Sequence, residues 1–355
     1  MTNFLCILLF NFLALLQPRT EATIIFAGDA MQHQSQLDAS RRGTEWAYDD
    51  CFARVAPWIK EADYAVVNLE TTLAEKNFTG YPCFASPDAF AKALADAGFD
   101  LFLNANNHTL DRRDKGLRRT LDVLDSMRVD HIGTYTDKPA RERNIPFVRN
   151  INGFKVGFLN YTYGTNGINP RSGAEVSLID KAKMKAEIAE TRKAGAELIV
   201  VCMHWGVEYV LTENAEQRQL AQFLIDQGVD MVIGSHPHVI QPMKIVVDEA
   251  TGKRVPVVYS LGNFISNMKI VNGRGGALVR CRIERAADGK ARFVEANYDT
   301  FFTVRPGNGG ADYIVVPSWL SDHIPSTQRP TWNAFDRAAQ KVFEQYNIDF
   351  PRLHH

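Results

Sequence analysis

Short, nearly unbroken runs of apolar residues recur along the chain, and each run ends abruptly in polar or Gly-rich residues. Several of them are continuous Val, Ile and Leu stretches, which are typical of strands buried on both faces of a sheet. We therefore predict strands at residues 23–27, 64–67, 100–103, 155–159, 198–203, 230–233 and 255–261.

Helical patterns lie between many of these runs, at residues 88–98, 115–127, 181–193 and 216–227. The first follows Ser86-Pro87, a capping residue with a proline beside it, and ends at Gly98, as helices often do. Strands that alternate with helices on this scale predict an α/β architecture in which many strands are parallel.

The last part of the chain has a different pattern. Residues 283–299 are predicted to form a β-hairpin that turns at Ala287-Asp288-Gly289. Beyond Arg305 the chain is richer in Pro and Gly and the alternation stops. We expect one domain over residues 23–300, followed by an irregular C-terminal appendage over residues 301–355 with a short helix near 333–344.

The amino terminus is typical of an export signal. Residues 4–16 are almost wholly apolar, and Thr20-Glu21-Ala22 follows as a cleavage site. The run is 13 residues long, roughly 20 Å as a helix against a hydrocarbon core of about 30 Å. No Lys or Arg precedes it, which departs from the usual pattern. We expect residues 1–22 to be a signal for export to a periplasmic or other extracytoplasmic location; an uncleaved signal would keep the protein at the membrane.

Charge and cysteine content narrow the function classes. Forty Lys and Arg against 41 Asp and Glu give a net charge of -1, so no overall field attracts nucleic acid. Cys202 and Cys281 lie in apolar runs and are predicted to be buried. Cys51 and Cys83 have more polar surroundings and are candidates for a disulfide in an oxidising compartment. No CxxC spacing exists, so structural zinc is not expected.

Polar side chains that can bind metal follow five separate strand-like runs. In open α/β sheets, ligands gather at the carboxyl ends of the strands. Five of the nine histidines fall in these segments, whereas a lone histidine such as His131 is more often structural. We expect one pocket to contain Asp29, His33, Glu70, Asn107, His204, His236 and His238.

This combination of imidazole, carboxylate and amide groups suits Mn, Zn or Fe ions better than calcium or magnesium alone. Seven candidate ligands exceed what one tetrahedral ion needs, so two divalent ions are expected. Two such ions about 3.5–4 Å apart can clamp a phosphoryl group and activate water.

Six motifs, in order, resemble those of CapA-type poly-γ-glutamate capsule biosynthesis proteins. The similarity covers residues 23–280 and rests on Gly28-Asp29-Ala30-Met31, Asn68-Leu69-Glu70, Asn106-Asn107-His108-Thr109-Leu110-Asp111, His204-Trp205-Gly206-Val207-Glu208-Tyr209, Gly234-Ser235-His236-Pro237-His238-Val239-Ile240-Gln241-Pro242 and Tyr259-Ser260-Leu261-Gly262-Asn263-Phe264. That family resembles a branch of the calcineurin-like metallophosphoesterases, which implies a four-layer α/β/β/α sandwich.

The resemblance also implies roles for individual residues at the first metal and between the two metals. Asp29 and His238 would hold the first ion, with His33 as a displaced partner. Glu70 would take the bridging position, and Asn68 beside it is a candidate substrate-binding residue. The longer Asp29–His33 spacing and a glutamate at the bridge depart from the metallophosphoesterase pattern.

At the second metal the resemblance implies three ligands, Asn107, His204 and His236. His108, next to Asn107, would protonate the leaving group as a general acid.

Two functions remain open from the sequence. One is a metal-dependent hydrolase acting on a phosphoester or an amide-linked polymer. The other is a binding or assembly factor for an anionic capsule polymer, with a vestigial or single-metal site. The resemblance implies an anionic capsule polymer or a phosphorylated substrate as ligand, and membrane capsule-synthesis proteins as partners. A purely structural domain would leave the clustered histidines unexplained.

Overall fold

A computed structural model describes residues 20–307 and 312–353. The larger of its two main sheets has eight strands, in the order β20-β19-β18-β1-β4-β7-β8, with β17 paired to β1. Strands β1, β4, β7 and β8 are parallel to one another, whereas β18, β19 and β20 join as antiparallel neighbours. The strands are β1 (Glu21–Ala30), β4 (Tyr64–Leu69), β7 (Leu101–Leu103), β8 (Asp130–Ile132), β17 (Asn263–Ile265), β18 (Gly275–Arg285), β19 (Ala291–Val304) and β20 (Ile314–Pro317).

The second sheet has six strands, in the order β10-β11-β13-β14-β16-β15. Its four middle strands are parallel and its two edge pairs are antiparallel. The strands are β10 (Phe147–Ile151), β11 (Phe154–Thr162), β13 (Leu198–His204), β14 (Met231–Ser235), β15 (Met243–Val247) and β16 (Arg254–Val258).

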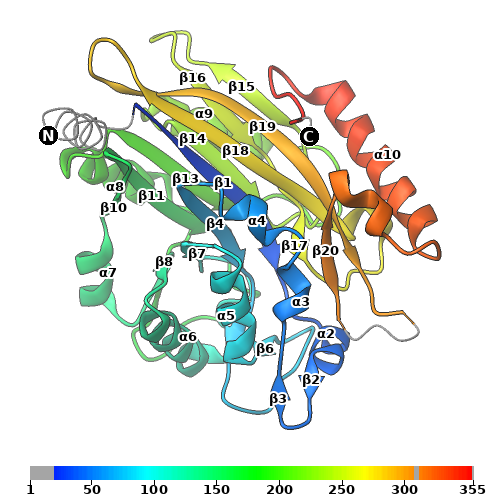
Figure 1. The fold of residues 1–355 in the computed structure, drawn as a ribbon. Coiled ribbons are helices and arrows are strands. Elements are labelled where there is room, and N and C mark those ends of the chain that lie inside the picture. The colour runs from blue at the N-terminus through cyan, green and yellow to red at the C-terminus, as the bar shows by residue number, and fades with distance from the viewer. Residues whose placement is uncertain (1–19, 308–311, 354–355) are drawn as a thin grey trace, which may run out of the picture.

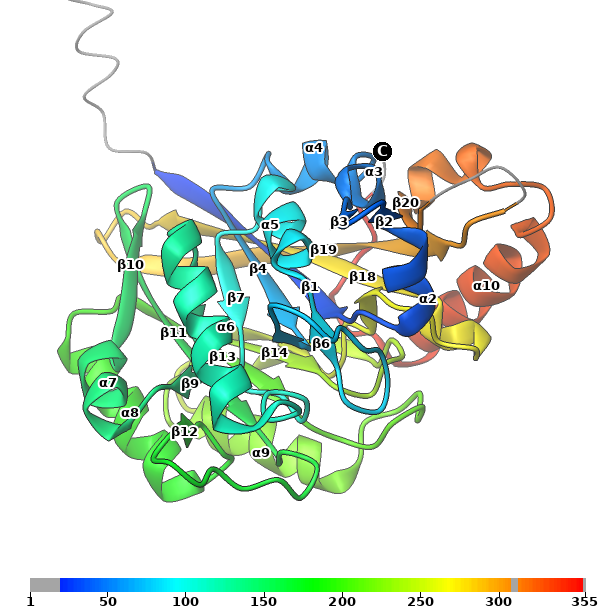
Figure 2. The ribbon, with the colours of Figure 1, turned by 90° about the horizontal axis from the view of Figure 1, so that it is seen from below.

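The two sheets pack face to face, and helices cover both outer faces (Figures 1 and 2). Strand β1 shows why the sequence demands this: Ile24 and Phe26 point into the core between the sheets, whereas Ile25 and Ala27 pack under the helices. The covering helices are α3 (Asp49–Phe52), α4 (Ala56–Ile59) and α5 (Asp88–Asp96) on the larger sheet, and α8 (Lys181–Lys193) and α9 (Ala215–Asp226) on the smaller. The predicted four-layer α/β/β/α sandwich is confirmed.

The remaining elements lie around the margins of the sandwich. Helix α6, which follows β7, packs Leu124 into the outer core of the larger sheet, whereas Leu117 and Leu121 belong to a small separate cluster. These elements are α2 (Gln34–Ala39), α6 (Arg113–Met127), α7 (Lys138–Asn144), the short strand pairs β2 (Arg41–Arg42) with β3 (Glu45–Trp46), β5 (Thr72–Leu73) with β6 (Ala85–Ser86) and β9 (Thr134–Tyr135) with β12 (Glu175–Val176), and the 3-10 turns η1 (Val271–Gly273) and η2 (Ser318–His323).

The C-terminal stretch is more regular than predicted. Strand β19 continues to Val304, β20 forms the edge of the larger sheet, and helix α10 spans Arg329–Tyr346. Trp332, Phe335 and Phe343 of α10 join the core between the sheets. The expected helix near 333–344 is present within α10, but the rest of the segment is not irregular, because it completes both the sheet edge and the core.

The predicted Cys51–Cys83 disulfide is not formed. Both cysteines are free thiols: Cys51 is buried and Cys83 is exposed. Cys51 belongs to α3, which packs it into the core under the larger sheet, and burial raises the pKa of its thiol. Cys83 lies in the loop before β6. The prediction failed because it had no information on where these two segments lie in the fold.

The predicted export signal, residues 1–22, falls mostly outside the described residues. Strand β1 begins at Glu21, and Ala22 is buried and pairs with Ile283 of β18. Among residues 20–307 and 312–353, no helix is both long enough and apolar enough to cross a membrane.

Candidate metal centre

Strand ends from both sheets meet at one place. Asp29 lies near the end of β1, Glu70 directly follows β4, and His204 ends β13. The loop after β14 brings His236 and His238, and the loop after β7 brings Asn107. All six side chains are almost completely buried. The sheets carry them to a common edge because β1 and β4 are parallel neighbours, as are β13 and β14.

A close backbone approach sets the position of Asp29. A Cβ atom on Gly28 would lie 1.9 Å from the carbonyl oxygen of Gly262, so only glycine allows the two chains to meet here. The Asp29 N–H donates to that same oxygen at 3.0 Å. A side chain at residue 28 would push Asp29 away from the histidines.

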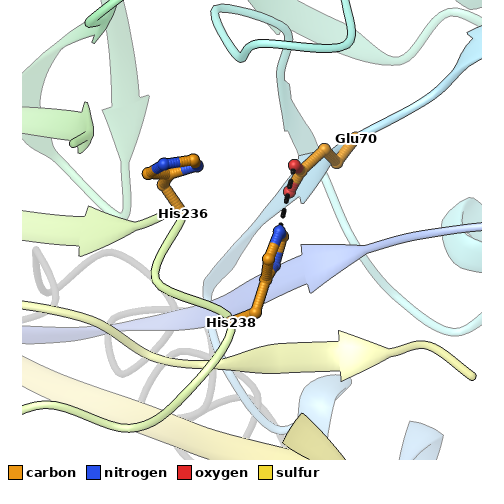
Figure 3. Close-up of side chains that lie close together, drawn as sticks. All are labelled: Glu70, His236 and His238. Carbon is orange, nitrogen blue, oxygen red and sulfur yellow. Dashed lines mark ion pairs between the residues drawn. The ribbon is translucent and has the colours of Figure 1, made fainter. Parts of the chain in front are cut away.

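Five of these residues form two overlapping groups that each could hold a metal ion. Group 1 is Glu70, His236 and His238, and group 2 is Asp29, Glu70 and His204. Within each group, one ligand atom per residue lies within 4.8 Å of the others. Figure 3 shows group 1, with the Glu70 carboxylate pointing at the His238 ring. Glu70 belongs to both groups, which is the position expected of a bridging ligand.

The histidines are close enough to one another for more than one pairing. The ring centroid of His236 lies 4.7 Å from that of His204 and 5.8 Å from that of His238, and His238 also contacts Asp29, as the resemblance implies. In the turn His236-Pro237-His238, φ is 99° at His236 and 57° at His238. Left-handed backbone is costly for both residues and is often found at functional sites. This turn brings both imidazoles to the same side.

Hydrogen bonds hold the Nδ1 atoms of two histidines. Nδ1 of His238 lies 3.1 Å from Oδ2 of Asp29 and 3.0 Å from Oδ1 of Asn263. Nδ1 of His204 lies 3.2 Å from Oγ of Ser235. Their Nε2 atoms lie 3.8 Å and 3.7 Å from Oε1 of Glu70. Metal-binding histidines are commonly oriented in this way, by a partner on the other ring nitrogen.

Two buried atoms of group 1 lack a hydrogen-bond partner within the described part of the chain: Oε1 of Glu70 and Nδ1 of His236. Buried polar atoms are rarely left unsatisfied, since each costs about 1–3 kcal/mol. A carboxylate oxygen and an imidazole nitrogen that lie together are ligands for a divalent transition metal. The residues present therefore fit such an ion.

The electrostatics of the pocket also favour a bound cation. Burial opposes ionisation of Asp29, but its hydrogen bond with His238 and the nearby imidazoles outweigh burial and hold its pKa well below the usual range. Burial and the charge of Asp29 raise the pKa of Glu70 well above normal. Burial lowers the pKa of His236 to about 3 and that of His204 well below its usual value. Neutral imidazoles beside a carboxylate that resists ionisation are the arrangement that a divalent ion stabilises.

The two asparagines have different surroundings. Oδ1 of Asn107 lies 2.9 Å from Nε2 of His204, on the edge of group 2. Asn68 was predicted to bind substrate, but its amide donates to Oδ1 of Asp29 at 2.7 Å and to Oε2 of Glu70 at 3.3 Å. Its carbonyl oxygen accepts from Asn106 at 3.1 Å. Asn68 is buried, and its hydrogen bonds to Asp29 and Glu70 position both carboxylates.

His33 is not a member of either group among the described residues. Its own N–H donates to Oε1 of Gln36 at 2.8 Å, and its Nδ1 accepts the N–H of Asn267 at 3.2 Å. Burial lowers its pKa to about 4. Helix α2 begins directly after His33, which is the N-cap residue of that helix.

His108 lies beside the groups and belongs to neither of them within the described chain. Its Nδ1 lies 2.8 Å from Oδ2 of Asp111, and the same oxygen accepts the N–H of Phe84 at 2.6 Å. The Phe84 ring packs edge-on against the imidazole, with 4.6 Å between centroids. His108 is therefore held at one nitrogen by an oriented carboxylate, as a proton donor requires.

Two residues at the site were not predicted from the sequence. Asn263 contacts His238, although it was noted only as part of a motif. Tyr163 packs on His236, with 4.5 Å between ring centroids. It follows β11, which was predicted to end at residue 159 but continues to Thr162. The polar residues that follow residue 159 could have indicated that the chain approaches the site here.

Comparisons with known proteins identify the family of this chain. A model of the family described as bacterial capsule synthesis protein PGA_cap matches residues 23–268. The capsule biosynthesis protein CapA of Bacillus anthracis is 28% identical over 348 residues, covering 92% of this chain and 73% of that protein. The PGA biosynthesis protein CapA of Bacillus subtilis is 27% identical over 247 residues, covering 68% of this chain and 63% of that protein.

Among solved structures, the NAD nucleotidase of Haemophilus influenzae is similar with a TM-score of 0.49 and 11% identity, over 93% of this chain and 64% of that one. The family match spans well over half of the chain and includes every candidate ligand, from Asp29 to His238. This chain therefore belongs to the PGA_cap family of bacterial capsule synthesis proteins.

Proposed function

We propose that this protein is an exported, metal-dependent hydrolase that cleaves a phosphoester or amide bond in the biosynthesis of poly-γ-glutamate or a related capsule polymer. The observation that carries the proposal is the convergence of both groups on Glu70, with two partnerless ligand atoms in the described structure. The names of the two Bacillus relatives support the capsule process.

Bound divalent ions would supply Lewis-acid activation of the scissile group and of water. The residues of groups 1 and 2 would hold them, with Asn107 beside group 2. His108 would carry the proton. In its imidazolium form, Nδ1–H donates to Asp111 and Nε2–H is free to protonate the leaving group. Asn68 keeps the Asp29 and Glu70 carboxylates in place throughout.

Metal content tests this function directly. Protein loaded with Mn²⁺ and then dialysed is expected to retain about two ions per chain, measured by inductively coupled plasma mass spectrometry. The loaded protein is expected to hydrolyse p-nitrophenyl phosphate or a γ-glutamyl polymer. Protein that retains no metal and cleaves neither compound would contradict the proposal.

A second candidate function is a binding or assembly factor for an anionic capsule polymer, acting with membrane capsule-synthesis proteins. The separation of His33 from both groups favours it, because the first metal then lacks one of its expected ligands. Retention of the polymer without any cleavage, at one ion per chain or none, would support this function.

Export is part of the proposal and rests on the apolar run at residues 4–16. Native protein is expected outside the cytoplasmic membrane, with an amino terminus near Thr23. Amino-terminal sequencing of the protein recovered from each cell fraction measures both its location and its first residue. Ala22 lies in β1 and pairs with Ile283 of β18. Cleavage a few residues before Thr23 would therefore leave the sheet intact, and it would support export equally well. An intact Met1 in the soluble cytoplasmic fraction would exclude export.

A further inference from the structure

A cleft of about 440 Å³ opens beside the metal centre. This volume is in the range of small-molecule binding sites. At its inner end lie His108 and His238, which are buried, and His33, which is half-buried. At its open end lie Tyr81 and Tyr209, which are 72% and 47% exposed. The cleft therefore leads from solvent to the proposed proton donor.

Two aromatic walls form this cleft, and they come from separate loops. Tyr81 lies 6.3 Å from the ring of Phe84, which in turn packs on His108. Tyr209 lies 6.2 Å from the ring of His238. The walls therefore connect directly to the two histidines at the buried end, and a molecule between them would reach both.

The backbone at Tyr209 is held in an unfavourable conformation. Its φ is 65°, and its N–H donates to the carbonyl oxygen of Pro237 at 2.8 Å. Pro237 separates the two histidines of group 1. Left-handed backbone is costly for a residue with a large side chain and persists where the surroundings enforce it. The turn that aims the histidines thus also places the Tyr209 ring over the cleft.

The cleft is apolar and nearly balanced in charge. Met31, Met268 and Ile270 are among its lining residues, and Glu208 and Lys269 are the one acidic and the one strongly basic residue among those of the described chain that line it. A polyanionic chain would need an excess of cations here. An uncharged group with a flat or apolar surface fits better, since it packs on the rings and displaces water from them.

We propose that this cleft binds the leaving group of the substrate, and that this group is uncharged, apolar and at least the size of one ring. The cleft is assigned to the leaving group because the proposed proton donor, His108, lines it. The candidate ligands Asp29, Glu70, His204 and His236 do not line it. The fragment that departs toward the proton donor is the one that occupies the cleft. This inference rests on the proposed hydrolase function and names the class of substrate it takes.

The test compares phenyl phosphate with 2-naphthyl phosphate on Mn²⁺-loaded protein, because their leaving groups have similar acidity and differ mainly in apolar size. The wild type is expected to favour the naphthyl ester in kcat/KM by about 10-fold or more. Tyr209→Ala and Tyr81→Ala should each reduce that preference several-fold, whereas Tyr209→Phe should keep it. Val247→Ala, at an exposed residue of β15, is the control and should keep it too.

Calorimetric titration with phenylphosphonate and 2-naphthylphosphonate separates this inference from the proposed function. Tighter binding of the naphthyl compound, weakened in Tyr209→Ala, supports the cleft even if no variant shows turnover. Turnover without a naphthyl preference would overturn the inference and leave the hydrolase standing. A preference that survives both alanine substitutions, or no binding of either phosphonate, would also overturn it.

Discussion

Replacing His108 with alanine is expected to lower kcat by about 10²–10⁴-fold while the bound metal stays in place. His108 belongs to neither ligand group in the described structure, so its loss should not reduce the number of ions retained. Its contact with Asp111 and its place in the cleft suit it to protonate a leaving group. Steady-state kinetics and metal analysis of the same preparation measure both outcomes.

The leaving group makes the His108→Ala prediction specific. A lost general acid harms a poor leaving group more than a good one. The variant should therefore lose more activity on phenyl phosphate than on p-nitrophenyl phosphate. Asp111→Asn should show the same bias with a smaller loss, because Asp111 acts through His108. An equal loss of activity on both esters would contradict the proton-donor role. Loss of bound metal from His108→Ala would show that His108 is a metal ligand.

Replacing His236 with alanine is expected to remove both metal and turnover. His236 supplies one of three ligand atoms in group 1, and its Nδ1 has no hydrogen-bond partner among the described residues. No neighbouring side chain in group 1 can replace it, because Glu70 and His238 already contribute. We expect at least one ion per chain to be lost and hydrolysis to fall to background, as measured by mass spectrometry and ester hydrolysis.

His131→Ala is the matched control for His236→Ala. His131 belongs to β8, and its Nε2 lies 3.0 Å from Oδ1 of Asp125, away from both groups. It should keep metal and turnover. Thermal unfolding distinguishes a lost ligand from a lost fold: metal should raise the melting temperature of the wild type and of His131→Ala, but raise that of His236→Ala less. A His236→Ala protein that retains both ions would show that His236 is not a ligand.

The strands and helices of the sandwich were predictable because their signal is local. An unbroken apolar run such as the one ending at Met203 must be buried on both faces, wherever its partners come from. The C-terminal segment was harder to predict. The apolar stripe of α10, at Trp332, Phe335, Ala339 and Val342, was visible, but the Pro and Gly residues before it obscured the edge strand β20.

The candidate site was predictable in its membership and not in its geometry. Polar residues placed after buried strands have to meet if the strands are parallel, and Asp29, Glu70, His204, His236 and His238 do meet. His33 and Asn68 also lie at or just after the ends of buried strands, so the same reasoning included them in the site. His33 caps helix α2 and joins neither group among the described residues, and Asn68 is hydrogen-bonded to Asp29 and Asn106.

The sequence by itself determined which residues form strands, that their sheets are covered on both faces, and which side chains lie at the strand ends. The tertiary structure decided the distances among the histidines, the separation of Cys51 from Cys83, and the cleft between Tyr81 and Tyr209. The physical reason is the range of the forces involved. Burial of an apolar run depends on the run itself, whereas a distance between two loops depends on how both sheets pack.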